Sequence, residues 1–111
     1  MEEKIKISLL YQLYGKMLTE KQQEIIEDYY NNDLSLSEIA ENNDITRQAV
    51  RDIIKKSEKK LNSYEKTLGL MQKSIEQKNK IEEIIKMLSN IKKEEIKDIE
   101  KELKKLLNLY F

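Results

Sequence analysis

The chain has 111 residues, 39% hydrophobic and 38% charged, and its 21 basic and 21 acidic side chains leave no formal net charge. It contains neither cysteine nor histidine, which excludes a disulfide framework, a thiol-based metal site and a histidine general base. No apolar run approaches the roughly 20 residues that span a bilayer, and the charged opening lacks the pattern of a signal peptide. We therefore expect a cytoplasmic protein that is not an enzyme and uses no metal, cofactor or membrane contact.

The composition predicts an all-α fold, because proline is absent and only two glycines occur among many Lys, Glu, Leu and Ile residues. A first helix is predicted over about Lys4–Lys16, ending near Gly15. Its apolar face is expected to centre on a stripe at fourfold spacing, Ile5, Leu9, Leu13 and Met17, widened by Ile7, Leu10 and Tyr14.

The next two helices are marked by local start signals. Thr19 and Gln22 have the spacing of a capping box, so a second helix should begin after Thr19. Ser35 and Glu38 repeat the pattern and predict a short third helix over about 35–41. The second helix is expected to turn Ile25, Ile26, Tyr29 and Tyr30 toward the core.

A fourth helix is predicted after the turn residues Asn42–Asp44, from about Thr46 into the region around Leu61. With the third helix it forms the pattern of a helix-turn-helix unit. Ala40 is the small residue needed where two such helices cross closely, and Asp44 stands where the turn requires a left-handed backbone that Asp tolerates. The residues expected to anchor this unit to the domain are Ile39, Ile45, Val50 and Ile53. Ile54 and Leu61 are expected to face inward from the fourth helix together with Val50 and Ile53.

The fourth helix presents residues suited to nucleic acid. Thr46 can cap its start, and recognition helices insert the exposed residues of their first turns into the major groove. Only two basic residues of the chain are arginines, Arg47 and Arg51, and both lie here; arginine suits bidentate contact with guanine or phosphate, and Gln48 suits adenine. The predicted nucleic-acid-binding residues, whose lysines would follow the phosphate backbone, are Thr46, Arg47, Gln48, Arg51, Lys55, Lys56 and Lys59.

The charge distribution leaves a second use open. Residues 1–46 hold 4 basic and 10 acidic side chains (−6), residues 47–60 hold 6 and 2 (+4), and residues 61–111 hold 11 and 9 (+2). A basic segment beside an acidic one is typical of a local phosphate-facing surface. Three-helix domains with this motif also serve as protein-interaction modules, however, and the acidic first half would repel phosphates.

From Ser63 the pattern changes to long amphipathic helices, expected over about 64–88 and 92–109 with a break at Ser89–Asn90. They are predicted to form a hairpin or coiled-coil-like tail, or to associate with another chain. Because they carry more apolar residues than a lone hairpin buries, we expect a homodimer. The sequence is thus divided into a helix-turn-helix domain at 1–62 and a self-associating helical tail at 63–111.

Five segments together carry a resemblance to a known family: Tyr11–Gly15, Leu18–Gln23, Tyr29–Tyr30 with Asp33–Ala40, Thr46–Val50 and Tyr64–Leu70. In this order and spacing they resemble the YlxM family of helix-turn-helix DNA-binding proteins. The helix-turn-helix part alone is similar to region 4 of sigma factors. Beyond Gln72 the tail matches the family only in character, and Asn42–Asp44 replaces its more usual turn of an apolar residue and glycine.

The resemblance implies a head folded like sigma region 4, with residues 46–57 as recognition helix. It also implies a regulatory role in the signal recognition particle pathway, inferred for the family largely from gene neighbourhood. Two hypotheses follow. The chain is a sequence-specific duplex DNA binder that regulates transcription, or it is an accessory protein that docks on the signal recognition particle through the particle's GTPase or its RNA.

Overall fold

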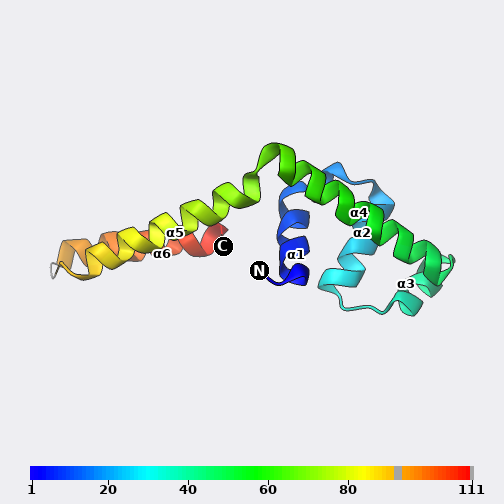
Figure 1. Ribbon diagram of the computed structural model, residues 1–111. Coiled ribbons are helices and arrows are strands. Elements are labelled where there is room, and N and C mark those ends of the chain that lie inside the picture. The colour runs from blue at the N-terminus through cyan, green and yellow to red at the C-terminus, as the bar shows by residue number, and fades with distance from the viewer. Residues whose placement is uncertain (92–93, 111) are drawn as a thin grey trace. The chain divides into compact units, whose positions relative to one another are not determined.

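The computed structural model describes residues 1–91 and 94–110 and confirms the expected all-α fold (Figure 1). The elements in chain order are α1 (Glu3–Tyr14), the 3₁₀ turn η1 (Gly15–Met17), α2 (Glu20–Ile26), the π turn η2 (Glu27–Asn31), α3 (Leu36–Asn43), α4 (Arg47–Leu68), α5 (Leu70–Ser89) and α6 (Glu94–Tyr110). The expected start of the last helix at residue 92 lies outside the described residues. Within the described part, no helix is both long and apolar enough to cross a membrane.

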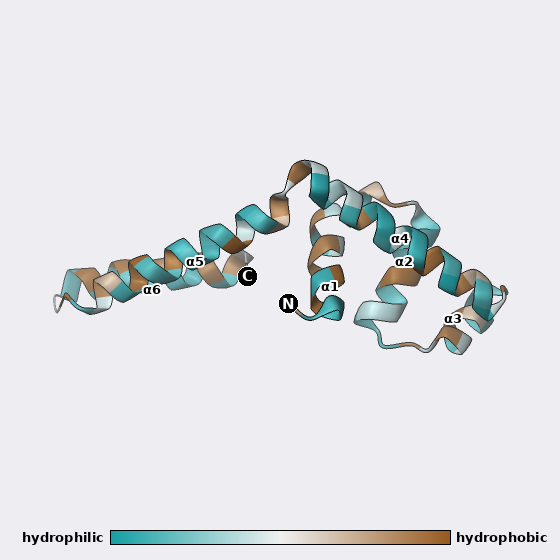
Figure 2. Ribbon diagram, viewed as in Figure 1, coloured by the Kyte–Doolittle hydropathy of each residue, from teal (hydrophilic) through white to brown (hydrophobic). Residues whose placement is uncertain are grey.

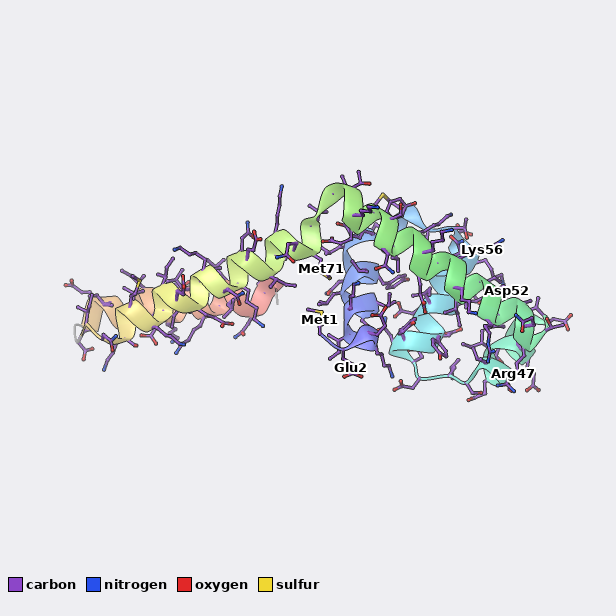
Figure 3. All side chains as sticks on the ribbon, in the orientation of Figure 1. Met1, Glu2, Arg47, Asp52, Lys56 and Met71 are labelled. Atoms are coloured by element: carbon purple, nitrogen blue, oxygen red, sulfur yellow. The ribbon has the colours of Figure 1, made fainter. Side chains whose placement is uncertain are left out.

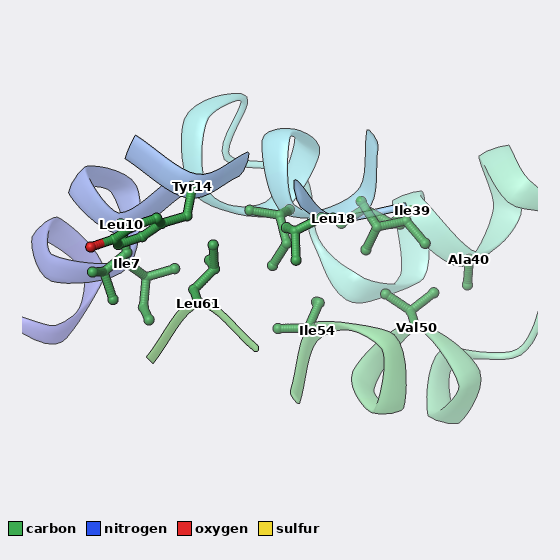
Figure 4. Packing of buried hydrophobic residues seen from close by; sticks show 11 residues of the cluster. Ile7, Leu10, Tyr14, Leu18, Ile39, Ala40, Val50, Ile54 and Leu61 are labelled. Atoms are coloured by element: carbon green, nitrogen blue, oxygen red, sulfur yellow. The ribbon is translucent and has the colours of Figure 1, made fainter. Parts of the chain in front are cut away.

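The chain divides into two compact units, Met1–Met71 and the residues from Gln72 onward. The division expected after residue 62 falls inside α4, which continues without a break to Leu68. In the first unit α4 packs against α1, α2 and α3. The core between these helices, shown in Figure 4, consists of Ile7, Leu10, Tyr14, Leu18, Ile25, Ile26, Ile39, Ala40, Val50, Ile54 and Leu61.

The buried face of α1 differs from the one predicted. The side chains at most 1% exposed are Ile7, Leu10 and Tyr14. The stripe predicted as the centre of the face is largely exposed, with values of 52% for Ile5, 40% for Leu13 and 47% for Met17. Both sets have helical spacing and both were predicted to be buried. The prediction is confirmed for the set at most 1% exposed and is wrong for Ile5, Leu13 and Met17. These exposed residues form an apolar row on the surface of the first unit.

Helix starts follow the predicted local chemistry. Both capping boxes are formed: Gln22 N–H donates to Thr19 Oγ1 at 3.2 Å, and Glu38 N–H donates to Ser35 Oγ at 3.1 Å, each with the reciprocal bond. The hydrogen bonds from Ser35 hold the pKa of Glu38 below its usual value. Replacing such a cap with alanine typically costs about 1 kcal/mol, so these residues define where α2 and α3 begin.

Gly69 separates α4 from α5, where the sequence predicted one helix over about 64–88. Its φ of 65° and ψ of 25° are left-handed, and its N–H donates to the Glu65 carbonyl at 2.8 Å. The first amides of α5 are satisfied by side chains of the first unit. Leu70 N–H donates to the Tyr14 hydroxyl at 3.0 Å, and Met71 N–H donates to Glu65 Oε1 at 2.8 Å. Tyr14 itself donates to Glu65 Oε1 at 2.7 Å, which completes an anchor for the start of α5.

In the second unit α5 and α6 run side by side as a hairpin, one of the two arrangements predicted for the tail (Figure 1). Apolar and polar residues alternate along both helices at helical spacing (Figure 2). Among the described residues of α5 and α6, none is buried in the way the core residues of the first unit are.

Candidate nucleic-acid interface

The turn between α3 and α4 has the geometry of a helix-turn-helix. Asp44 adopts the predicted left-handed conformation, with φ 54° and ψ 44°. The next amide, of Ile45, donates to the Ala40 carbonyl at 3.1 Å, a bond that closes the end of α3 in the manner of a Schellman motif. Ala40 is only 7% exposed, as expected for the small residue at the crossing.

Side chains reinforce this turn from both sides. Asn43 Nδ2 donates to the Ile39 carbonyl at 2.8 Å, and its Oδ1 accepts from Lys21 Nζ at 2.9 Å. Ile39 and Val50, predicted anchors, are fully buried. Ile45 was also predicted to anchor the unit but is 36% exposed. It directly follows the turn, outside both helices, which explains the error.

Thr46 caps α4 as predicted, its Oγ1 accepting from Ala49 N–H at 3.0 Å. Capping fixes the start of the helix at Arg47, so the first turn presents its side chains from a defined backbone. The start of a helix also carries partial positive charge, which favours an anion such as phosphate. The end of α4 that includes Thr46 and Arg47 therefore suits contact with a phosphate backbone.

All seven predicted nucleic-acid-binding residues are exposed, and they extend from Thr46 at the cap of α4 to Lys59 in its fourth turn. Figure 3 labels Arg47 and Lys56 among them. The seven residues do not form one strip. Arg51, Lys55 and Lys59 follow each other at fourfold spacing along one line of the helix, whereas Lys56 lies about 140° around the helix from Arg51. A duplex that contacts Arg51 would therefore also contact Lys55 and Lys59, but it would contact Lys56 less directly.

The two arginines differ from Gln48 in their partners. Neither Arg47 nor Arg51 forms an ion pair within the described residues. Gln48 Nε2, by contrast, donates to Asp52 Oδ1 at 3.0 Å. The fourfold spacing of Gln48 and Asp52 is visible in the sequence, but the prediction for Gln48 did not take this partner into account. An adenine contact by Gln48 would have to displace or share that carboxylate.

A hollow of about 270 Å³ beside Arg51 was not predicted. It is lined by Tyr29, Tyr30, Leu36, Arg51, Ile54, Lys55 and Glu58. The π turn η2 delivers its two tyrosines, whose rings meet edge to face with centroids 5.0 Å apart. Both pack against the core, as expected for the apolar face of the second helix.

The Tyr30 hydroxyl donates to Glu58 in this hollow. Burial, together with this hydrogen bond, raises the pKa of Tyr30 well above its usual value. The phenol therefore stays protonated at neutral pH and keeps the Glu58 carboxylate engaged beside two cations, Arg51 and Lys55. The hollow is a mixed-charge surface and not an isolated anion pocket.

The left-handed turn, the capped second helix and the exposed arginines define a helix-turn-helix protein. Over residues 1–110 the chain matches the UPF0122 family, described as "putative helix-turn-helix protein, YlxM / p13 like", and it belongs to this family. This confirms the resemblance drawn from the sequence. The family is described by its fold motif and not by a reaction.

Relatives of the same family cover most of the chain. The UPF0122 protein of Clostridium kluyveri is 48% identical over 101 residues, which span 88% of this chain and 91% of the relative. That of Desulforamulus reducens is 49% identical over 88 residues, 79% of this chain and 75% of the relative. That of Clostridium perfringens is 41% identical over 111 residues, 97% and 99% of the two chains. The similarity therefore extends through the tail.

Proposed function

We propose that the protein binds duplex DNA as a regulator of transcription, with α4 as recognition helix. The observation that carries the proposal is the pair of exposed arginines, without ion pairs among the described residues, on the first turns of a helix capped after a left-handed turn. Arg47 and Arg51 would contact guanine or phosphate, and Lys55 and Lys59 the phosphate backbone. Thr46 would hold the end of the helix against a phosphate.

The electrostatic contribution to duplex affinity is predicted to be moderate. If Arg47, Arg51, Lys55 and Lys59 each neutralise one phosphate, the logarithm of affinity falls with that of salt concentration with a slope of about −3.6 per head. The affinity of a single head should then drop about 150-fold between 50 and 200 mM salt. A protein without net charge has no long-range attraction beyond this surface, so the slope measures these contacts directly.

The test is fluorescence anisotropy with sheared genomic duplex at several salt concentrations. The Arg47→Ala/Arg51→Ala variant should lose most affinity and about half the salt slope. The matched control is Lys97→Ala/Lys101→Ala, which removes the same charge from α6 and should bind as wild type does. Equal binding by wild type and the arginine variant would contradict DNA reading by α4.

A second candidate function is docking on the signal recognition particle, the partner that the family resemblance implies, and a different observation favours protein docking of this kind. The apolar row represented by Ile5 and Leu13 of α1 and Met17 of η1 is exposed in the described structure. A hollow of about 540 Å³ lies next to it, lined by residues of α1 and η2 that include Leu9 and Glu27. Exposed apolar surface beside a hollow is typical of a protein-binding site. This surface is separate from the arginines of α4.

This second candidate is tested with the purified particle GTPase and, separately, the particle RNA. An Ile5→Lys/Leu13→Lys variant should lose GTPase binding and keep duplex binding, because both changes lie on α1. The Arg47→Ala/Arg51→Ala variant should show the converse. No binding of either particle component by wild type at low salt would rule out this function.

A further inference from the structure

The hairpin of α5 and α6 has a half-buried seam and one unpartnered face. The seam residues are the half-buried ones: Ser74, Ile75, Lys78, Ile81, Ile85 and Leu88 on α5, and Ile96, Glu100, Leu103 and Leu107 on α6. Large apolar side chains outside the seam stay exposed, with values of 37% for Ile84, 66% for Met87, 53% for Ile99 and 48% for Leu106. The pairing of the two helices therefore leaves much of their apolar surface in contact with water.

The exposed apolar residues lie on the same face of the hairpin. Each stands one position before a seam residue: Ile84 before Ile85, Ile99 before Glu100, and Leu106 before Leu107. A step of one residue turns the side-chain direction by about 100° around the helix axis, in the same sense on each helix. Because the helices are antiparallel, rotation in the same sense turns both sets toward the same side.

The polar residues on this face divide by sign. On α5 the positions preceding seam residues Ser74 and Ile81 are Lys73 and Lys80. On α6 the positions preceding Ile96 and Leu103 are Glu95 and Glu102. The α5 half of the face is thus basic and the α6 half acidic, with Lys80 also paired to Glu83 at 3.6 Å and Glu102 to Lys105 at 3.4 Å within their own helices. An apolar centre lies between them, where Ile84 and Ile99 are each five residues from the turn end of their helix.

We propose that this face binds the same face of a second copy of the chain, with the two-fold axis parallel to the helices. That symmetry places α5 of each copy over α6 of the other, which is the arrangement that pairs the basic half with the acidic half. Lys80 then lies near Glu102 of the other copy, and Ile84 lies over Ile99. The face is therefore complementary to itself, because opposite charges meet and the apolar residues lie at the same height along the helices, as an isologous interface requires.

The available area suffices for a stable pair. A helix of 17 residues, the length of α6, is about 26 Å long, and two adjacent helices present a face about 20 Å wide. Each copy therefore buries about 500 Å², and the pair about 1,000 Å², the size at which specific interfaces begin. The resulting four-helix arrangement would bury side chains that the single hairpin leaves exposed.

The first test is the mass in solution, measured by light scattering and sedimentation at about 100 µM protein. Wild type should have twice the 13.3 kDa of one chain. The Ile99→Gln/Leu106→Gln variant should dissociate at least tenfold more readily, whereas the control Lys97→Gln/Lys101→Gln, on the other side of α6, should remain a dimer. A monomeric wild type would overturn the proposal and assign the face to another protein. A variant as dimeric as wild type would overturn the assignment of the face.

The second test fixes the register and does not depend on the folding of the polar variant. Because the chain has no cysteine, engineered cysteines can link only to each other. Ile84→Cys and Ile99→Cys proteins, mixed and mildly oxidised, should give a disulfide-linked pair that neither protein gives alone. Linkage of each variant to itself, or no linkage on mixing, would overturn the placement of α5 over α6.

Discussion

Replacing Tyr14 with phenylalanine should destabilise the first unit by removing the anchor at the start of α5. The Tyr14 hydroxyl donates to Glu65 Oε1 at 2.7 Å and accepts from Leu70 N–H at 3.0 Å, and the side chain is 1% exposed. A hydrogen bond to a charged group contributes about 1.5–3 kcal/mol and a neutral one about 1. Phenylalanine keeps the ring, so the lost polar contacts dominate, and we expect a destabilisation of about 2–3 kcal/mol.

For a chain of this length, 1 kcal/mol corresponds to about 4 °C, so the Tm should fall by about 10 °C in a thermal melt followed by circular dichroism. Tyr64→Phe is the matched control, because the Tyr64 hydroxyl makes only a long bond of 3.4 Å to the Met17 carbonyl. Its Tm should change by less than about 2 °C. Equal shifts for the two variants would refute the reasoning, as would additive effects of Tyr14→Phe and Glu65→Gln in a double-mutant cycle.

Three further predictions concern the turn, the recognition helix and alkaline pH. Asp44→Ala should cost about 1–2 kcal/mol in urea unfolding, because alanine is strained at positive φ, whereas Asp44→Gly should stay within about 1 kcal/mol of wild type; equal losses would contradict this. Asp52→Asn should tighten duplex binding a few-fold in low-salt anisotropy titrations, because a charge that repels phosphate is lost; unchanged affinity would contradict it. Stability should fall above about pH 10, by up to about 1.4 kcal/mol per pH unit for each buried tyrosine, because the unfolded phenol releases its proton first. Tyr30→Phe should reduce that slope in urea titrations at pH 10–12, and an unchanged slope would count against it.

Local chemistry was the most predictable part of the fold. The caps at Thr19, Ser35 and Thr46, and the left-handed Asp44, follow from interactions within a few residues, which are legible in the sequence. Arg47, Gln48, Arg51 and Lys55 were predicted to be exposed for the same reason, since each is polar and lies away from the apolar positions of one helix. Their use in binding remains a prediction.

Features that depend on distant partners were not predictable. The sequence of α1 offers two apolar stripes of equal quality, and only the packing of α4 decides that Tyr14, and not Leu13, is buried. The helix break at Gly69 is not evident in the sequence, because the apolar spacing continues through it. The break depends on the left-handed turn and on Tyr14 and Glu65, side chains that no short window of sequence connects with α5.

DNA binding by α4 and dimerisation through α5 and α6 can be tested together by one quantity, the salt dependence of duplex binding. One head with four contacting cations gives a slope of about −3.6, and two heads of a dimer bound to one duplex give about −7. The Ile99→Gln/Leu106→Gln variant leaves α4 unchanged and should therefore bring the slope from the second value to the first. If the variant is monomeric and the slope does not change, each head binds DNA alone and the dimer serves another purpose. If the slope is halved, the tail doubles the electrostatic contact of a protein whose total charge is zero.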